Sequence, residues 1–139
     1  MPLMTGEELL EFQRREFPQT VDMGISVEEL SDTHIVIGMK TTDRHLRPGG
    51  TVSGPTMMEL ADLTMYFLLL AQIGPVALAV TTNLSINFLR KPEPGSLRAT
   101  GKLLKLGRSL AVGEISIFSG DMSEPVAHVT TTYSIPPKR

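Results

Sequence analysis

The sequence predicts an α+β fold in which a long antiparallel β-sheet wraps around one central helix. One long apolar segment, residues 54–73, has helical length and is ended by Gly74-Pro75. The segments after it carry strand-like patterns and are joined by short turns. A helix that is apolar on nearly every side must be covered on nearly every side, and a curled antiparallel sheet can do this.

The elements before the central helix are short. The N-terminal segment, residues 1–20, contains an amphipathic helix over residues 5–16, with Pro18 as a stop signal. Residues 22–41 contain two β-like runs. The loop that follows ends at the central helix, which Ser53 or Gly54 can cap.

The segments after the central helix alternate with period two or are rich in β-branched residues. Residues 82–88 place apolar side chains on one face and polar side chains on the other. Three further strands are expected over residues 97–106, 109–118 and 125–135, with Gly107 at the turn between the first two of them. All 139 residues are therefore expected to form a single domain.

The amino-acid composition excludes several classes of function. The 41% hydrophobic and 20% charged residues are typical of a globular protein, and a formal net charge of −2 argues against a nucleic-acid partner. The absence of cysteine excludes disulfides and thiolate catalysis, and we predict neither a metal nor an organic cofactor. The N-terminus lacks the apolar core of a signal peptide, so a cytoplasmic location is expected.

The apolar segment is also long enough to span a membrane. Glu59, Asp62, Thr64 and Gln72 interrupt it, and a carboxylate at the centre of a bilayer is costly. We therefore expect a helix buried in protein and no membrane partner.

Several motifs occur in a fixed order. The stretch HLRPGGTVSGP at residues 45–55 is followed by Glu59-Leu60-Ala61-Asp62, and further on by VTTNLSINFLR at residues 80–90 and by Leu106-Gly107-Arg108. This ordered set resembles the hot-dog thioesterase superfamily, and within it the phenylacetyl-CoA (PaaI-like) thioesterase group. The resemblance covers most of the chain from about residue 22. It implies a hot-dog fold and an acyl-CoA thioesterase, for which coenzyme A is part of the substrate.

The chain departs from that group at residues that orient the substrate. Ser53-Gly54-Pro55 replaces His-Gly-Gly, and Arg47 replaces the usual Asn. The glycine at position 54 and the helical carboxylate of Asp62 are kept.

Asp62 is the candidate catalytic carboxylate. A carboxylate within an apolar helix is costly unless it is hydrogen-bonded or functional, and local hydrogen bonding at an interface is the structural alternative. Thioester hydrolysis needs an activated water or a nucleophilic carboxylate, and fixed donors for the oxyanion. We interpret Asp62 as general base or nucleophile, and the Gly54 backbone N–H at the helix N-terminus as the oxyanion donor.

The spacing of these two groups predicts a dimer. Gly54 and Asp62 lie eight residues apart, which is ~12 Å along one helix. One thioester carbonyl can hardly reach both groups in one chain. A two-fold dimer with antiparallel central helices would pair Gly54 of one protomer with Asp62 of the other, with a dimer of dimers as a larger alternative.

Other candidate residues have a functional and a structural interpretation. Glu59 is either a rival carboxylate or a charge favoured by the helix dipole. Thr81 matches a residue that positions water in related enzymes, or is an ordinary strand threonine. Ser53 contacts substrate or caps the helix, and Arg47 contacts substrate or is solvated.

Two regions are expected to hold the substrate. Met58 and Tyr66 line an acyl pocket or belong to the core. Arg90 and Lys91 bind the phosphates of coenzyme A or form a solvated strand face. The main hypothesis is an acyl-CoA thioesterase. The alternatives are a non-catalytic acyl-CoA or acyl-carrier-protein binding protein, and a hot-dog dehydratase, for which no suitable histidine precedes the helix.

Overall fold

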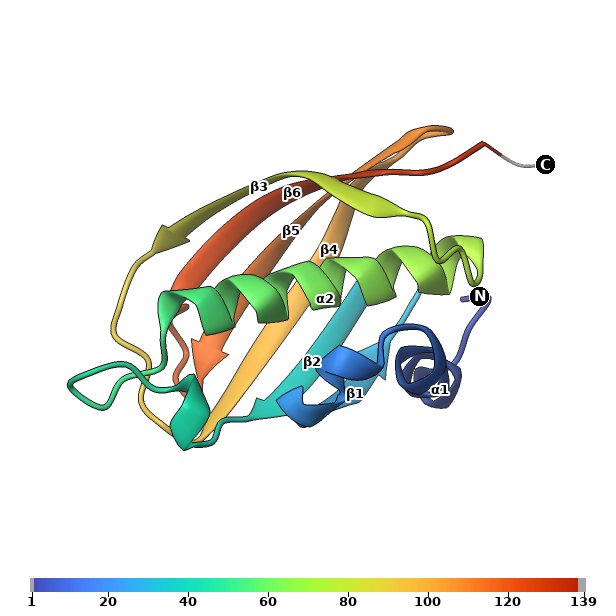
Figure 1. Cartoon of the computed structure of the whole chain (residues 1–139). Coiled ribbons are helices and arrows are strands. Elements are labelled where there is room, and N and C mark those ends of the chain that lie inside the picture. Colours follow the sequence, from blue (N-terminus) through green and yellow to red (C-terminus); the bar gives the residue numbers. More distant parts are fainter. Residues whose placement is uncertain (1, 138–139) are drawn as a thin grey trace.

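A six-stranded antiparallel sheet curls around one long helix, α2 (Gly54–Ile73), in the computed structural model, which describes residues 2–137 (Figure 1). The strand order across the sheet is β1-β2-β4-β5-β6-β3. The strands are β1 (Ile25–Leu30), β2 (His34–Lys40), β3 (Val80–Phe88), β4 (Ser96–Leu106), β5 (Leu110–Ser119) and β6 (Ala127–Ser134). The predicted α+β hot-dog architecture is thereby confirmed.

Both ends of α2 have identifiable caps. The Ser53 hydroxyl accepts a hydrogen bond from the Thr56 backbone N–H at 3.3 Å, and Pro55 occupies the first turn, where a missing N–H costs nothing. Gly74 ends the helix in a positive-φ conformation (93°), and its N–H donates to the Leu70 carbonyl at 2.7 Å.

Most of α2 is buried against the concave face of the sheet. Thirteen of its 20 residues are buried. By length and composition α2 could cross a membrane, and 72% of its most apolar window is buried inside the fold. The apolar character of α2 is therefore accounted for by contact with the sheet.

Two inward-facing glycines allow α2 to lie close to the sheet. A Cβ atom added to Gly101 on β4 would lie 3.1 Å from the Thr64 methyl group, and one added to Gly113 on β5 would lie 2.6 Å from the Met65 sulfur. A side chain at either position would push the helix away from the sheet or force a side chain out of place.

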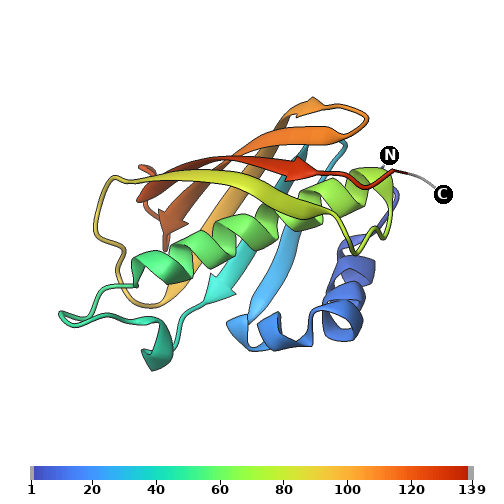
Figure 2. The same cartoon turned by 45° about the horizontal axis from the view of Figure 1, so that its top comes forward.

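The N-terminal helix α1 (Gly6–Glu16) lies beside β1 and the C-terminal half of α2 (Figure 2). Thr5 and Glu8 form a capping box at its start, and Leu9 and Phe12 are buried. Pro18 does more than end this helix, because it begins a 3₁₀ helix, η1 (Pro18–Met23).

His45 joins the loop before α2 to the start of that helix. The loop contains a short 3₁₀ helix, η2 (Asp43–His45). The buried imidazole accepts a hydrogen bond from the Thr42 backbone N–H at its Nδ1 (2.9 Å), and the His45 carbonyl accepts from the Ser53 N–H at 2.8 Å. Nδ1 as acceptor requires a neutral ring with the proton on Nε2. Burial, and next the charge of Arg44, lower the pKa of His45.

We predict that protonation of His45 destabilises the fold. The unfolded chain takes up a proton below pH 6.5, the ordinary pKa of histidine, whereas the folded chain resists it because its pKa is lowered. The unfolded state then binds more protons, so the free energy of unfolding falls as the pH drops from 6.5 toward the lowered pKa. Urea unfolding between pH 8 and pH 5 measures this slope. His45→Gln should flatten it, and the control His34→Gln should flatten it less; equal slopes in wild type and His45→Gln would refute the assignment.

Candidate active site

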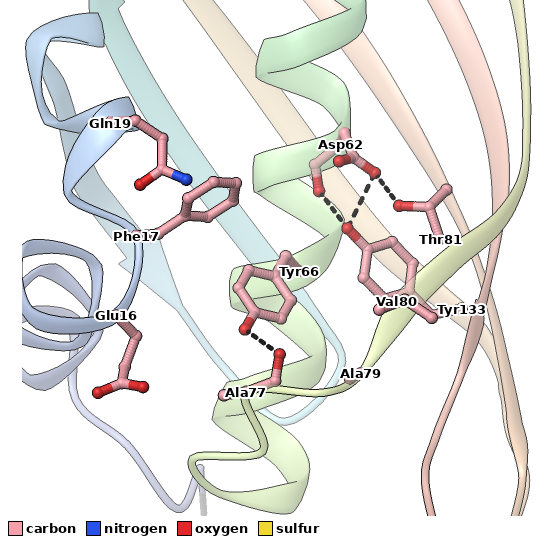
Figure 3. Close-up of a pocket in the computed structure, with 10 residues that line it drawn as sticks. All are labelled: Glu16, Phe17, Gln19, Asp62, Tyr66, Ala77, Ala79, Val80, Thr81 and Tyr133. Atoms are coloured by element: carbon pink, nitrogen blue, oxygen red, sulfur yellow. Dashed lines mark hydrogen bonds between the residues drawn. The ribbon is translucent and has the colours of Figure 1, made fainter.

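Hydroxyl groups from two neighbouring strands hold the carboxylate of Asp62. The Thr81 hydroxyl on β3 donates to Asp62 Oδ1 at 2.5 Å. The Tyr133 hydroxyl on β6 lies 2.9 Å from the same Oδ1 and 3.0 Å from the Asp62 backbone carbonyl oxygen (Figure 3). Asp62 itself is partly buried, so its carboxylate lies at the border between the core and the outside.

The pairing of β3 with β6 brings the two hydroxyls together. Thr81 and Tyr133 are register partners, and the register shifts between Thr81 and Asn83. On β6 the buried positions alternate, ending at Thr131 and Tyr133, so Tyr133 faces α2. Period-two alternation on one strand and antiparallel pairing with the next therefore direct both side chains at the same point of the helix.

Tyr133 is rigidly placed and remains a hydrogen-bond donor. It is 2% exposed, and its ring stacks on that of Tyr66 with centroids 6.0 Å apart and planes 22° from parallel. Burial, and next the charge of Asp62, raise the pKa of Tyr133 well above its usual value. Tyr66 donates its own hydroxyl to the Ala77 carbonyl oxygen at 3.0 Å, and burial raises its pKa as well.

Asp62 lines a cavity of about 390 Å³ between α2, β3 and the N-terminal helical segment. Asp62, Thr81 and Tyr133 lie on one side of it, and Phe17 and Gln19 lie on the other (Figure 3). The remaining lining residues are Glu16, Tyr66, Ala77, Ala79 and Val80. The cavity thus combines one carboxylate with aromatic walls, the mixture of apolar surface and few polar groups that ligand sites show.

Gly54 lines a different cavity, of about 340 Å³. Within residues 2–137 no group accepts a hydrogen bond from the Gly54 backbone N–H. A Cβ atom at this position would lie 3.2 Å from the ring of Phe88, which is itself 51% exposed. The other residues of this cavity are Arg47, Thr51, Val52, Met57, Arg90, Lys91 and Pro92. Three of the predicted substrate-binding residues therefore lie beside Gly54.

A single chain does not bring the two halves of the predicted site together. The cavity at Asp62 and the cavity at Gly54 share no residue. The two residues are separated by two turns of a straight helix, ~12 Å along its axis.

Two of the predicted substrate-binding residues, Arg90 and Ser53, form hydrogen bonds within the fold. Arg90 donates to the Pro125 carbonyl oxygen at 2.6 Å and forms an ion pair with Glu124 at 2.8 Å. The Ser53 hydroxyl caps α2 and lies 2.8 Å from the Thr56 hydroxyl.

Met58 and Glu59 were considered for the acyl pocket and as a rival carboxylate, respectively, and both lie outside the Asp62 cavity. Met58 is 41% exposed, and Glu59 is exposed on the same side of α2; neither lines the cavity. Glu59 is therefore separated from the hydroxyls that hold Asp62.

The site predicted from the sequence did not include Tyr133, Phe17 or Gln19. The alternation along the last strand identifies Tyr133 as an inward position, but it carries no information on which helical residue lies opposite. Phe17 and Gln19 reach the cavity only because α1 packs beside α2. In the described part of the chain, no group of three or more His, Asp or Glu residues is arranged to hold a metal ion.

Comparison with known proteins agrees with this architecture. The family model of the thioesterase superfamily matches residues 49–126. A candidate thioesterase from Silicibacter sp. TM1040 is 48% identical, with a TM-score of 0.90 over 99% of this chain and 95% of that one. No protein of curated function matches the sequence at a significant level.

Two more distant structures share the fold. The E. coli PaaI protein from the phenylacetic acid degradation operon is 21% identical, with a TM-score of 0.82 over 94% of this chain and 93% of that one. A hypothetical thioesterase from Streptococcus pneumoniae TIGR4, solved with coenzyme A, is 20% identical, with a TM-score of 0.75 over 97% of this chain and 99% of that one.

Proposed function

Because this chain belongs to the thioesterase superfamily, we propose that it hydrolyses acyl-CoA thioesters to a free acid and coenzyme A, with Asp62 as the catalytic carboxylate. The observation that carries the proposal is the carboxylate itself: it is held by two hydroxyls at the wall of a cavity, on a helix of which most residues are buried. The coenzyme A in the Streptococcus pneumoniae structure supports the choice of thioester.

Asp62 can act in two ways. As a general base it takes a proton from water while the water oxygen adds to the thioester carbon. As a nucleophile it adds to that carbon itself and forms a mixed anhydride, which water then hydrolyses. In both cases the C–S bond breaks and the thiolate of coenzyme A takes up a proton. Thr81, through its hydrogen bond to Oδ1, holds the carboxylate for either role.

The oxyanion is stabilised by the backbone N–H of Gly54. This group lies at the N-terminus of α2, where the helix dipole favours negative charge, and it has no acceptor among the described residues. Since Gly54 and Asp62 line separate cavities in one chain, each site is completed by a second copy. Gly54 of one protomer then faces Asp62 of its partner, and a two-fold dimer holds two equivalent sites.

The surface around Asp62 supports this dimer. On α2 the exposed residues Pro55, Met58 and Glu59 form a stripe that leads to Asp62. The neighbouring edge strand β3 carries no charged residue over Val80–Phe88, and Phe88 at its end is exposed. An uncharged edge strand is a template for pairing with another strand. A homodimer that covers the stripe and this edge is the arrangement we propose, with a dimer of dimers as a further assembly.

The substrate then extends in two directions from the reacting carbon. The acyl group enters the cavity with the aromatic walls of Phe17 and Tyr66, which suits an aromatic or medium-length chain. The phosphates of coenzyme A lie at Arg47 and Lys91, beside Gly54. Arg90 lines the same cavity while its guanidinium group is held by Glu124, so we assign it a smaller share of the phosphate binding.

The first prediction from the proposed function concerns the carboxylate of Asp62. In an assay of thiol release over a panel of acyl-CoAs, Asp62→Asn should lower kcat by about 10²- to 10⁴-fold, the range that a general acid or base contributes. Glu59→Gln is the comparison variant, because it removes a nearby carboxylate of the same helix that lies outside the cavity. Glu59 lies on the stripe that the dimer covers, so sedimentation first has to show that Glu59→Gln is still a dimer, and that dimer should keep wild-type kcat. Tight binding of acyl-CoA by the wild type without any turnover would instead identify a non-catalytic binding protein.

The second prediction concerns the dimer. Gly54→Pro removes the N–H at the first position of α2, where a helix tolerates proline, and it should be inactive alone, as should Asp62→Asn. Gly54→Ala adds the same Cβ beside Phe88 but keeps the N–H, so it should retain more activity than Gly54→Pro. Refolding the two variants together at equal amounts should restore about a quarter of wild-type activity, because half of the dimers are mixed and each mixed dimer has one intact site. Sedimentation should show dimers throughout. An active monomer, or no recovery in mixed dimers, would refute the shared site.

The third prediction concerns the phosphates. Lys91→Gln and Arg47→Gln should each raise KM for acyl-CoA and the inhibition constant of free coenzyme A by about 3- to 10-fold, with little change in kcat, because each removes one charged contact. Lys105→Gln, an exposed lysine that does not line this cavity, is the control. Equal effects of all three variants would indicate only a general loss of positive charge.

A further inference from the structure

We propose that Tyr133 is a positioning residue that orients the carboxylate of Asp62 and leaves its Oδ2 as the reacting oxygen. The inference rests on the proposed function for its kinetic consequences, whereas the hydrogen bond on which it depends can be tested without any substrate.

The hydroxyl of Tyr133 joins the side chain of Asp62 to its own backbone. It lies 2.9 Å from Oδ1 and 3.0 Å from the carbonyl oxygen of the same residue. A group that contacts both ends of one residue restricts rotation about its Cα–Cβ bond. The carboxylate is thereby kept in one rotamer, which is the kind of fixed geometry that proximity effects in catalysis require.

The two hydroxyls act on one oxygen. Thr81 and Tyr133 both lie within hydrogen-bond distance of Oδ1, and none of the other residues from 2 to 137 donates to Oδ2. Oδ1 accepts the Thr81 hydrogen bond and shares the one proton of the Tyr133 hydroxyl with the Asp62 carbonyl oxygen, so it has less capacity than Oδ2 to accept a proton or attack carbon. Oδ2 is therefore the oxygen that takes the proton from water or adds to the thioester.

Tyr133 is held more rigidly than Thr81, the other residue whose hydroxyl contacts Asp62. Thr81 lies on the exposed edge strand β3, next to a shift in register, whereas Tyr133 lies on the interior strand β6. Its ring is buried and stacked on Tyr66. Without Tyr133, Asp62 would be held only through an edge strand, so the loss of this one hydroxyl should loosen the carboxylate.

The hydrogen bond persists over the pH range of an assay. Burial keeps the pKa of Tyr133 raised, so the tyrosine keeps its proton and donates over the whole pH range in which a thioesterase can be assayed. Removing this donor should therefore release the carboxylate of Asp62 from its single orientation at every pH of the assay.

The test compares Tyr133→Phe with Tyr66→Phe. Both variants remove one hydroxyl from the wall of the same cavity, but the hydroxyl of Tyr66 donates to the Ala77 carbonyl oxygen and not to Asp62. Tyr133→Phe should lower kcat at least about tenfold with little change in KM, because the lost hydrogen bond to a charged group orients the carboxylate and does not hold the substrate. Tyr66→Phe should act mainly on KM. Equal kcat for wild type and Tyr133→Phe would overturn the proposal.

A measurement on the free protein separates this inference from the proposed function. The three-bond couplings between the Hα and Hβ protons of Asp62, measured by NMR, report its χ1 rotamer. They should show one rotamer in the wild type and in Tyr66→Phe, and averaging over several rotamers in Tyr133→Phe. Such averaging supports the assignment even if no acyl-CoA is hydrolysed, in which case the proposed function alone fails. A single unchanged rotamer in Tyr133→Phe, with thermal unfolding like that of the wild type, overturns the role of Tyr133 even in an active enzyme.

Discussion

The burial of α2 in the concave face of a single sheet is the constraint on which the rest of the structure depends. A helix with this many apolar residues is stable in water only if other elements cover it. The sheet does so by curling, and inward glycines on β4 and β5 let it approach the helix closely. One sheet cannot enclose a helix completely, however, and the side of α2 near Pro55, Met58 and Glu59 stays uncovered.

Asp62 lies at the border of this uncovered side. Deeper in the fold the charged carboxylate would lose its hydration, and fully outside it would have no fixed orientation. At the border it keeps access to a cavity while the Thr81 and Tyr133 hydroxyls replace part of its hydration. The hydroxyls that offset the cost of partly burying the carboxylate therefore also fix its orientation.

The two edge strands of the sheet differ in how well they are protected against pairing with another chain, and β3 is the less protected one. Strand β1 carries two glutamates, and α1 lies beside it. Strand β3 carries no charge and is largely exposed. Edge strands are usually protected by charge or by a covering element, and only β1 has both. The unprotected edge lies next to Asp62, so an association that covers β3 would also bring a second chain to the carboxylate.

Much of the architecture could be predicted because its signals are local. Gly74-Pro75 marks the end of α2, Ser53 marks its start, and period-two alternation marks the later strands. Asp62 was recognisable as a candidate because a carboxylate in an apolar helix is unusual, and its spacing to Gly54 follows from helix geometry alone.

The tertiary structure alone decided which residues meet. Tyr133 reaches Asp62 across 71 positions because β6 packs against α2, and Phe17 reaches the same cavity because α1 packs beside α2. Arg90, predicted either to bind phosphates or to belong to a solvated strand face, forms an ion pair with Glu124, which is 34 positions away in the sequence. Hydrophobic periodicity and the Gly and Pro residues at segment ends describe one segment at a time. Strand order and register, in contrast, result from packing the whole chain around one helix. The sequence by itself therefore determined the elements and the carboxylate, and the fold determined the partners that orient it.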